Sequence, residues 1–230
     1  MTSCALKNPA FSISVTLPRR QREQLRCIDD VYPQVFDAIL EHPIAPAPRF
    51  TEESLGQRFG VSRSVIRQVL ERLARQQVVI LRPNHRPQVA APDAEQTRQI
   101  FHARRLAETT LVRLACQQPA SRHLPQLRQW VERERQCLEQ NQRAAAIRLS
   151  GEFHLQLADV AGNAPLAQFL ERLVPLTSLA LAQGQAPILA DGTWQAHLAL
   201  VEAVERGDAR MAETLINRHL DHLQALLLNP

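Results

Sequence analysis

The sequence of 230 residues is short of aromatic residues, glycines and runs of β-branched residues. Only 4% of its residues are aromatic, and seven are glycines. Strands favour aromatic and β-branched side chains, whereas Leu and Ala, which are plentiful here, favour helices. The composition therefore predicts a mainly helical protein, long enough for one large domain or two smaller ones.

Cysteine pairs and long apolar runs are lacking too. The four cysteines are scattered and form no CxxC pair, which argues against a disulfide framework or a zinc ribbon and indicates a reducing cytosol. No run approaches the roughly 20 apolar residues of a membrane span. Residues 1–27 are basic but contain no continuous apolar segment like that of a secretory signal. An Arg-rich transit peptide has a similar composition; we interpret this segment as a flexible basic arm.

Common catalytic motifs are missing as well. The sequence contains no HExxH, no GxSxG and no glycine-rich phosphate-binding loop, and we therefore expect a protein that is not an enzyme. What it does contain is an uneven distribution of charge. Residues 1–92 hold thirteen Lys and Arg against eight Asp and Glu, whereas the remainder carries one net negative charge. A basic front half favours an anionic partner.

Two short helices joined by a tight turn are predicted in this basic half. Apolar residues at helical spacing predict a first helix over residues 28–42, and the prolines of IAPAPRF end it. Thr51 is the expected N-cap of a short helix that Gly60 terminates, and Ser62 is the expected N-cap of the next helix. This spacing is typical of a helix-turn-helix.

A small hairpin follows. VVIL and QVA predict two strands around the turn RPNHRP, so the N-terminal part is expected to be a winged helix. Asp93 and Gln96 form a capping box that begins a further helix. We place the domain boundary near residues 88–94.

Only helical patterning follows this boundary. Six or seven helices fit an antiparallel bundle, with breaks expected at residues 117–123, 161–165, 174–177, 185–193 and 206–208. The predicted fold is mainly α: a winged helix-turn-helix domain over residues 28–92, with a small β-hairpin, and an all-α antiparallel bundle over residues 93–230.

The start of the second motif helix offers side chains that suit DNA. Its apolar residues would anchor the back of the helix, and its N-terminus would enter a major groove. Arginine can donate two hydrogen bonds to a guanine base or bind a phosphate, and small hydroxyls contact phosphate without steric conflict. Two arginines one turn apart are common on any solvated helix face, so the prediction depends on their combination with a wing. We expect double-stranded DNA to be contacted by Ser62, Arg63, Ser64, Arg67, Arg49, Arg82, Asn84, His85 and Arg86.

The segment FTEESLGQRFGVSRSVIRQVLERLARQQVVILRPNHRPQV resembles the DNA-binding domain of the GntR family of bacterial transcription regulators. The resemblance covers about residues 31–92 and rests on the Gly-Val-Ser-Arg turn that begins at Gly60, on Arg67 and on the Arg-Pro-Asn turn of the wing. The sequence departs from the family at Glu53, where an arginine is usual, and at Arg86, where the wing usually has glycine. These departures concern the operator sequence and not the class of protein.

Histidines interrupt three apolar stripes in the second half of the chain. A single histidine on an apolar face is usually a core residue with a satisfied partner. Three of them on different helices of one bundle are costly to bury without partners, whereas one divalent cation satisfies all three. Three histidines with an open position suit Zn²⁺, Ni²⁺ or a related metal. The three residues are His154, His197 and His219.

The second half resembles the FCD ligand-binding domain of the FadR subfamily, a helical bundle that holds a metal through one Asp and three His and often senses small carboxylates. The resemblance implies that the three histidines are the metal ligands. The family's Asp lies one turn before the first histidine, where this sequence has Ser150. Because a serine hydroxyl is a poor metal ligand, water, Glu108 or a carboxylate of the effector would fill that position. The alternative is a cavity that binds its ligand without metal.

The segment ARRLAETTLVRLA is similar to the first bundle helix of the same family, with Arg104 and Glu108 at the matched positions. Arg104 is a candidate to grip an effector carboxylate with two N–H groups, in a site that includes Glu108 and Ser150. At positions i and i+4, Arg104 and Glu108 also suit an ordinary helix ion pair. The sequence allows both interpretations.

The leading hypothesis is a ligand-responsive DNA-binding transcription regulator that acts as a homodimer. An operator with two half-sites is bound by two winged helices, one from each protomer. Effector binding in the bundle would change the placement of the winged helices and so the affinity for the operator. The competing hypotheses are a metal-dependent hydrolase with a nucleic-acid-binding appendage and an architectural DNA binder. A hydrolase needs a general base, and Glu152 points away from His154 on the same helix.

Overall fold

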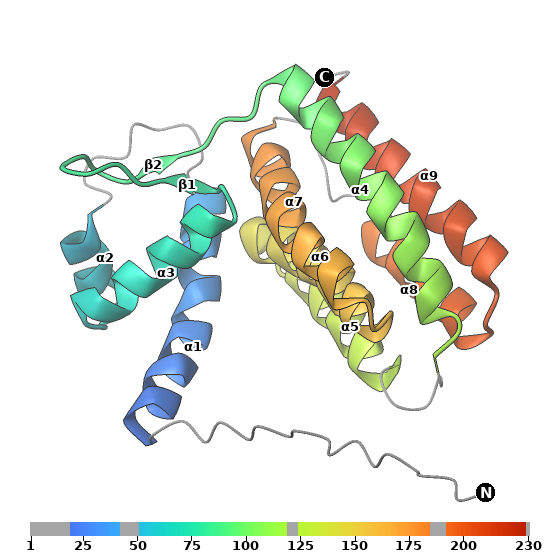
Figure 1. Cartoon of the computed structure of the whole chain (residues 1–230), viewed down its shortest axis with the longest axis horizontal. Coiled ribbons are helices and arrows are strands. Elements are labelled where there is room, and N and C mark those ends of the chain that lie inside the picture. The colour runs from blue at the N-terminus through green and yellow to red at the C-terminus, as the bar shows by residue number, and fades with distance from the viewer. Residues whose placement is uncertain (1–18, 42–50, 119–123, 185–191, 229–230) are drawn as a thin grey trace, which may run out of the picture.

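The structure is a computed structural model that describes residues 19–41, 51–118, 124–184 and 192–228, with side chains from Ile28 onward. A small N-terminal unit of three helices and a hairpin lies beside a bundle formed by the later helices (Figure 1). The elements are α1 (Arg19–Glu41), α2 (Glu52–Phe59), α3 (Arg63–Arg75), β1 (Val79–Ile80), β2 (Gln88–Val89), α4 (Ala94–Ala115), α5 (Leu124–Glu139), α6 (Arg143–Val160), α7 (Ala164–Gln183), α8 (Thr193–Glu205) and α9 (Ala209–Leu228).

The predicted helix-turn-helix is confirmed, together with the residues that end its helices. The Thr51 side chain accepts a hydrogen bond from the backbone N–H of Ser54 and caps α2, and that of Ser62 accepts one from Val65 and caps α3. Gly60 has a φ of 66°, a left-handed conformation that glycine adopts without steric cost. The chain therefore reverses within a few residues and leaves the start of α3 exposed.

In the N-terminal unit, α1 packs against α3. Val35, Ile66, Val69 and Leu73 are fully buried there. The first helix begins earlier than predicted: α1 starts at Arg19, so the interpretation of residues 1–27 as a flexible arm is wrong for the part from Arg19 on. The segment RRQREQLR consists of residues with high helix propensity, which lets the helix extend without any apolar stripe.

The hairpin is confirmed but is shorter than expected. Its two antiparallel strands pair Val79 with Val89 and Ile80 with Gln88. Asn84, at the tip, has a φ of 59°, a left-handed conformation that Asn tolerates better than most residues. The turn therefore exposes the side chains between the strands and forms a wing.

Six helices of the described residues form the C-terminal bundle, as predicted, and Asp93 with Gln96 makes the expected capping box of α4. The predicted break at residues 174–177 is wrong, because α7 continues through Pro175. A proline removes one backbone N–H and strains the preceding turn. Here the residues on both sides of it lie on a buried face, and their packing outweighs the local penalty.

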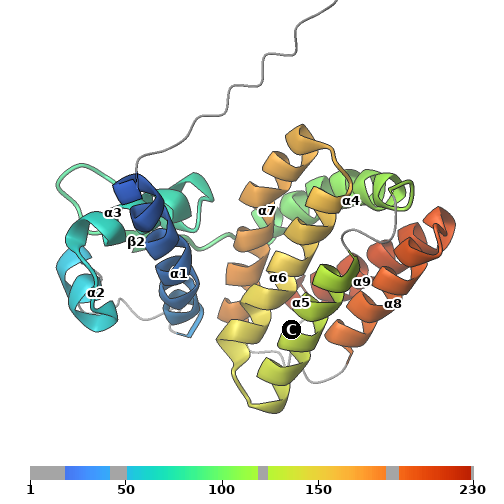
Figure 2. The ribbon, with the colours of Figure 1, turned by 90° about the horizontal axis from the view of Figure 1, so that it is seen from below.

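One helix, α6, lies at the centre of the fold. It packs against α4, α5 and α7 in the bundle and also against α1 of the N-terminal unit. Figure 2 shows it between α5 and α7, with α1 on the side of the smaller unit. Among the helices that the structure describes, none is both long and apolar enough to cross a membrane.

Candidate functional site

The three histidines predicted from the apolar stripes come together inside the bundle. His154 of α6, His197 of α8 and His219 of α9 are 3%, 1% and 6% exposed. One nitrogen of each ring lies within 4.8 Å of a nitrogen of the other two. The rings also contact one another directly, with centroids 4.7–5.1 Å apart. Three helices thus contribute one imidazole each to a single buried cluster.

Two carboxylates hold the outer nitrogens of these rings. Nδ1 of His154 donates to Glu108 at 2.6 Å, and Nδ1 of His197 donates to Glu134 at 2.7 Å. A carboxylate on Nδ1 leaves the lone pair on Nε2, which is the arrangement found behind metal-ligating histidines. Nε2 of His154 lies 3.3 Å from Nε2 of His219, and Nε2 of His197 has no hydrogen-bond partner among the described residues. The inner nitrogens therefore face a shared space.

The protonation of the cluster suits metal binding. Burial, together with neighbouring positive charges, lowers the pKa of His154 and that of His219, and for His154 this outweighs the opposing effect of Glu108. Both imidazoles are therefore neutral at pH 7, and the neutral imidazole is the form that binds metals.

Arg104 and Glu108 lie together inside the bundle. They form an ion pair, with Nε of Arg104 2.6 Å from the Glu108 carboxylate, but this pair is buried. Arg104 is only 2% exposed; its Nη1 donates to the Thr177 hydroxyl, while Nη2 has no partner in the described part of the chain. Burial would raise the pKa of Glu108, but the charge of Arg104 and the contact with His154 lower it. One N–H group of a buried guanidinium is thus free to bind an anion.

Ser150 lies one turn before His154 on α6 and is buried. It stands where the resembled family has its Asp ligand. The structure instead supplies carboxylates behind the rings, from α4 and α5. The negative charge that Ser150 lacks is therefore present behind the imidazole rings, at their outer nitrogens.

Glu134 was missed by the sequence analysis. It is fully buried on α5, and one oxygen of its carboxylate has no hydrogen-bond partner within the described residues. The signal was present, because Leu124, Leu127 and Val131 form an apolar stripe that Glu134 continues at the next helical position. A charged residue in that place requires a buried partner.

The buried charges around the cluster do not balance when the imidazoles are neutral. Arg104 compensates Glu108, whereas His197 is the only hydrogen-bond partner of Glu134 in the part of the chain that the structure describes. An uncompensated buried charge is strongly destabilising. A cation bound at Nε2 of His197 would balance Glu134 and would also use the lone pairs of the other two rings.

The predicted DNA-contacting residues at the start of α3 are exposed. The side chains of Arg63 and Arg67 are 65% and 61% exposed, but each is paired with a carboxylate of α2. Nη2 of Arg63 lies 2.7 Å from Glu53, and Nε and Nη2 of Arg67 lie 3.0 and 2.9 Å from the two oxygens of Glu52. Glu53, where the family usually has an arginine, therefore neutralises its neighbour across the turn.

The other predicted DNA contacts divide into three groups. Ser62 and Ser64 are exposed beside Arg63. At the wing tip the exposed residues are Arg82, Asn84, His85 and Arg86. Nδ1 of His85 donates to the carbonyl of Pro83 at 2.8 Å and stabilises the tip. Arg49 lies outside the described residues.

Comparisons with known proteins agree with both parts of this architecture. Residues 28–89 match the family described as bacterial regulatory proteins, gntR family, and residues 99–222 match the FCD domain. The chain is 25% identical to the Uxu operon regulator of Haemophilus influenzae, over 77% of this chain and 72% of that protein. It is also 25% identical to the HTH-type transcriptional repressor NanR of an Enterobacter species, over 95% of this chain and 92% of that one.

The fold is shared with a solved structure. The E. coli protein McbR/YncC superposes with a TM-score of 0.69 at 18% identity, over 90% of this chain and 97% of that one. The FCD match covers more than half of the chain and directly follows the gntR match, in the same order as the two units of the structure. The chain therefore belongs to the gntR family of bacterial regulatory proteins, with an FCD domain as its C-terminal bundle.

Proposed function

We propose that this transcription regulator reads an operator with the start of α3 and the wing, and that a divalent metal ion and a small carboxylate effector bind in the FCD bundle and change the affinity for that operator. The observation that carries the sensing part is the convergence of three buried histidines whose outer nitrogens are held by carboxylates. We also propose that the chain divides into a DNA-binding domain and an effector domain near residues 88–94.

The donor set at the cluster fits a metal ion. His154, His197 and His219 would be its ligands, and Zn²⁺ or Ni²⁺ suits three imidazoles with open positions. Two nitrogens bound to one tetrahedral Zn²⁺ lie roughly 3.3 Å apart, which is the distance between Nε2 of His154 and Nε2 of His219. When bound, the metal supplies positive charge and open positions for an anionic ligand.

The charges also indicate the class of effector. A divalent cation with Arg104, Glu108 and Glu134 leaves the buried site with one net positive charge. The free Nη2 of Arg104 would donate to a carboxylate oxygen, because guanidinium groups bind carboxylates with good geometry. Ser150 would add a hydroxyl from the same side as His154. We therefore propose a small carboxylate as the effector.

Catalysis is not proposed. The carboxylates of Glu108 and Glu134 lie at the outer nitrogens of His154 and His197, on the side of the rings away from the inner nitrogens. Glu152 is paired with Arg148 on another face of α6. Among the described residues, no carboxylate base would therefore stand beside a metal-activated water at the inner nitrogens, and the relatives are named as regulators.

Two further proposals come from the relatives and from DNA geometry. The NanR relatives are named as repressors, and we propose repression for this protein too. Paired half-sites on an operator are read by paired winged helices, so we propose that the protein acts as a homodimer.

Arg63→Ala and Arg67→Ala are each expected to weaken binding to the operator by about 1–3 kcal/mol. The operator is first isolated by selection from random DNA. Each substitution removes an exposed guanidinium from the start of α3, the part of the helix that we propose enters the groove. The matched control is Arg98→Ala, which removes an exposed arginine paired with Glu95 on α4. Fluorescence anisotropy with labelled duplexes measures the change. Normal operator binding by both α3 variants would show that this helix does not read the DNA.

Glu52→Gln is expected to strengthen binding to DNA of random sequence. The Glu52 carboxylate holds two N–H groups of Arg67, and its removal frees one positive charge for a phosphate. The slope of log K against log salt is expected to steepen by about 0.9, which a salt titration measures. Glu95→Gln, which frees Arg98 on α4, should leave the slope unchanged. An unchanged slope in Glu52→Gln would mean that Arg67 stays away from the phosphates.

A further inference from the structure

Helix α6 takes part in two different sites on opposite faces. Ser150 and His154 are buried on the face that points to the histidine cluster. Arg148 and Glu152 lie about half a turn away around the helix and form an ion pair with an N–O distance of 3.0 Å. Since a helix moves as a nearly rigid rod, a shift of His154 displaces Arg148 as well.

Arg148 joins the bundle to the N-terminal unit. Its Nε lies 2.7 Å from one oxygen of Asp37 on α1, and its Nη2 lies 3.1 Å from the other. The side chains of Arg148 and Asp37 are only 11% and 22% exposed. A two-pronged, partly buried pair of this kind is directional and poorly screened by salt, unlike an ordinary surface ion pair.

From α1 the contacts continue to the recognition helix α3. The Tyr32 hydroxyl donates to the side-chain oxygen of Gln76 at 2.8 Å, and the Arg72 guanidinium lies 4.0 Å from the centre of the Tyr32 ring. Arg72 also pairs with Asp29 of α1 at 3.0 Å. The position of α1 therefore fixes that of α3.

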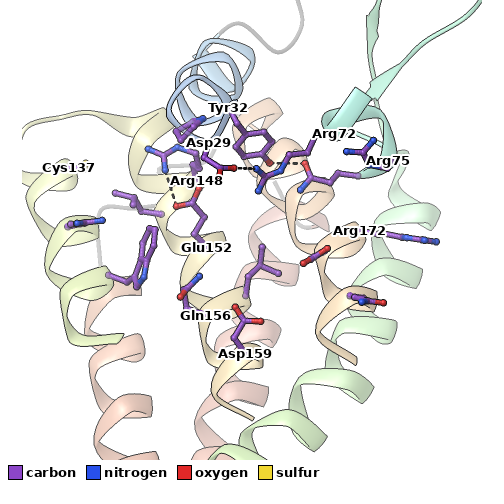
Figure 3. A pocket seen from close by; sticks show the side chains of 18 of the residues that line it. Asp29, Tyr32, Arg72, Arg75, Cys137, Arg148, Glu152, Gln156, Asp159 and Arg172 are labelled. Carbon is purple, nitrogen blue, oxygen red and sulfur yellow. Dashed lines mark hydrogen bonds and ion pairs between the residues drawn. The ribbon is translucent and has the colours of Figure 1, made fainter. Parts of the chain in front are cut away.

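Tyr32, Arg72 and Arg148 line an open cavity of about 1300 Å³ between the two units. Its walls come from α1 and α3 on one side and from α5, α6 and α7 on the other. Figure 3 shows Tyr32 and Arg72 on the first side and Arg148 with Glu152 on the second. Beside this space, the ion pair between Arg148 and Asp37 is a directional polar link across the junction, in addition to the packing of α1 against α6.

We propose that Arg148 is a positioning residue that transmits binding at the histidine cluster to α1 and, through Tyr32, to α3. This inference rests on the proposed function, because it needs a ligand at the cluster. Binding that draws His154 toward the other rings moves α6, and the pair with Asp37 carries the movement into the N-terminal unit. The two sites are thereby coupled through one continuous set of contacts.

The test compares wild type with Asp37→Asn and Arg148→Lys, using Zn²⁺ alone as the probe. Asp37→Asn keeps the size of the side chain, and Arg148→Lys keeps the charge but loses the two-pronged contact. Hydrogen exchange of the α1 amides and operator affinity are measured with and without the metal, and calorimetry measures Zn²⁺ binding itself. Glu41→Gln is the matched control, since Glu41 is an exposed carboxylate on the same helix.

Zn²⁺ is expected to change α1 exchange in wild type and in Glu41→Gln, and to change operator affinity by about 5-fold or more. In both test variants Zn²⁺ should bind equally well at the histidines while the two responses are largely lost. Metal binding to wild type without any change in α1 exchange would overturn the inference and leave the metal site standing. Equal responses in wild type and in the variants would overturn it too. No Zn²⁺ binding to any variant would refute the proposed metal site itself, and the inference with it.

Discussion

Zn²⁺ or Ni²⁺ added to chelator-treated protein is expected to raise its unfolding temperature by about 10 °C, and His197→Ala is expected to abolish the increase. A ligand present at 1000 times its Kd stabilises the native state by about 4 kcal/mol. In a chain of this size, that corresponds to about 8–16 °C. His197 contributes a buried Nε2 that has no other described partner, so its removal leaves the metal with an incomplete set of ligands.

The control for this measurement is His222→Ala, which removes an exposed histidine from α9, the helix that carries His219. It should keep the full metal response. The readout is differential scanning fluorimetry after EDTA treatment, repeated with each metal. If no metal raises the unfolding temperature of the wild type, the cluster does not bind metal under these conditions. The cluster would then belong to a metal-free effector site, the alternative that the sequence also allows.

Glu108→Leu is expected to lower the stability of the metal-free protein by about 3–5 kcal/mol, because it leaves a buried guanidinium without its counter-charge. Arg104 is 2% exposed, and its only other hydrogen-bond partner in the described residues is the Thr177 hydroxyl. The double variant Arg104→Met with Glu108→Leu removes both charges and should recover most of the loss. Urea denaturation measures both variants.

The matched control is Glu95→Leu on the same helix, where the carboxylate forms an exposed pair with Arg98. Its effect should stay below about 1 kcal/mol. If Glu108→Leu and the double variant were equally unstable, the loss would come from packing or from the contact with His154 and not from an unpaired charge.

Local chemistry is what made the fold predictable from the sequence. Thr51, Ser62 and Asp93 cap their helices through hydrogen bonds that span three residues, and such short-range rules hold in most contexts. Pro175 was misjudged because its local penalty is opposed by packing against helices far away in the sequence. The start of α1 was misplaced because the search followed apolar periodicity, which its first residues do not have.

The candidate site shows the same division. The three histidines could be found because each interrupts an apolar stripe on its own helix. That Glu134 lies behind His197, across a separation of 63 residues, depends on how α5 packs against α8. The pairing of Arg67 with Glu52 likewise depends on the angle between α2 and α3. Contacts between elements require the three-dimensional arrangement, whereas patterns within one element do not.

The two carboxylates on α2 also bear on how fast this protein finds its target. Arg67 and Arg63 already form ion pairs with Glu52 and Glu53, so they attract DNA of other sequence only weakly. Nonspecific binding to DNA grows with the number of positive side chains that are free to neutralise phosphates. Each chance encounter is therefore brief. If α3 reads the operator as we propose, this weaker nonspecific binding shortens the search for the operator, where base edges would replace the two glutamates as partners of the arginines.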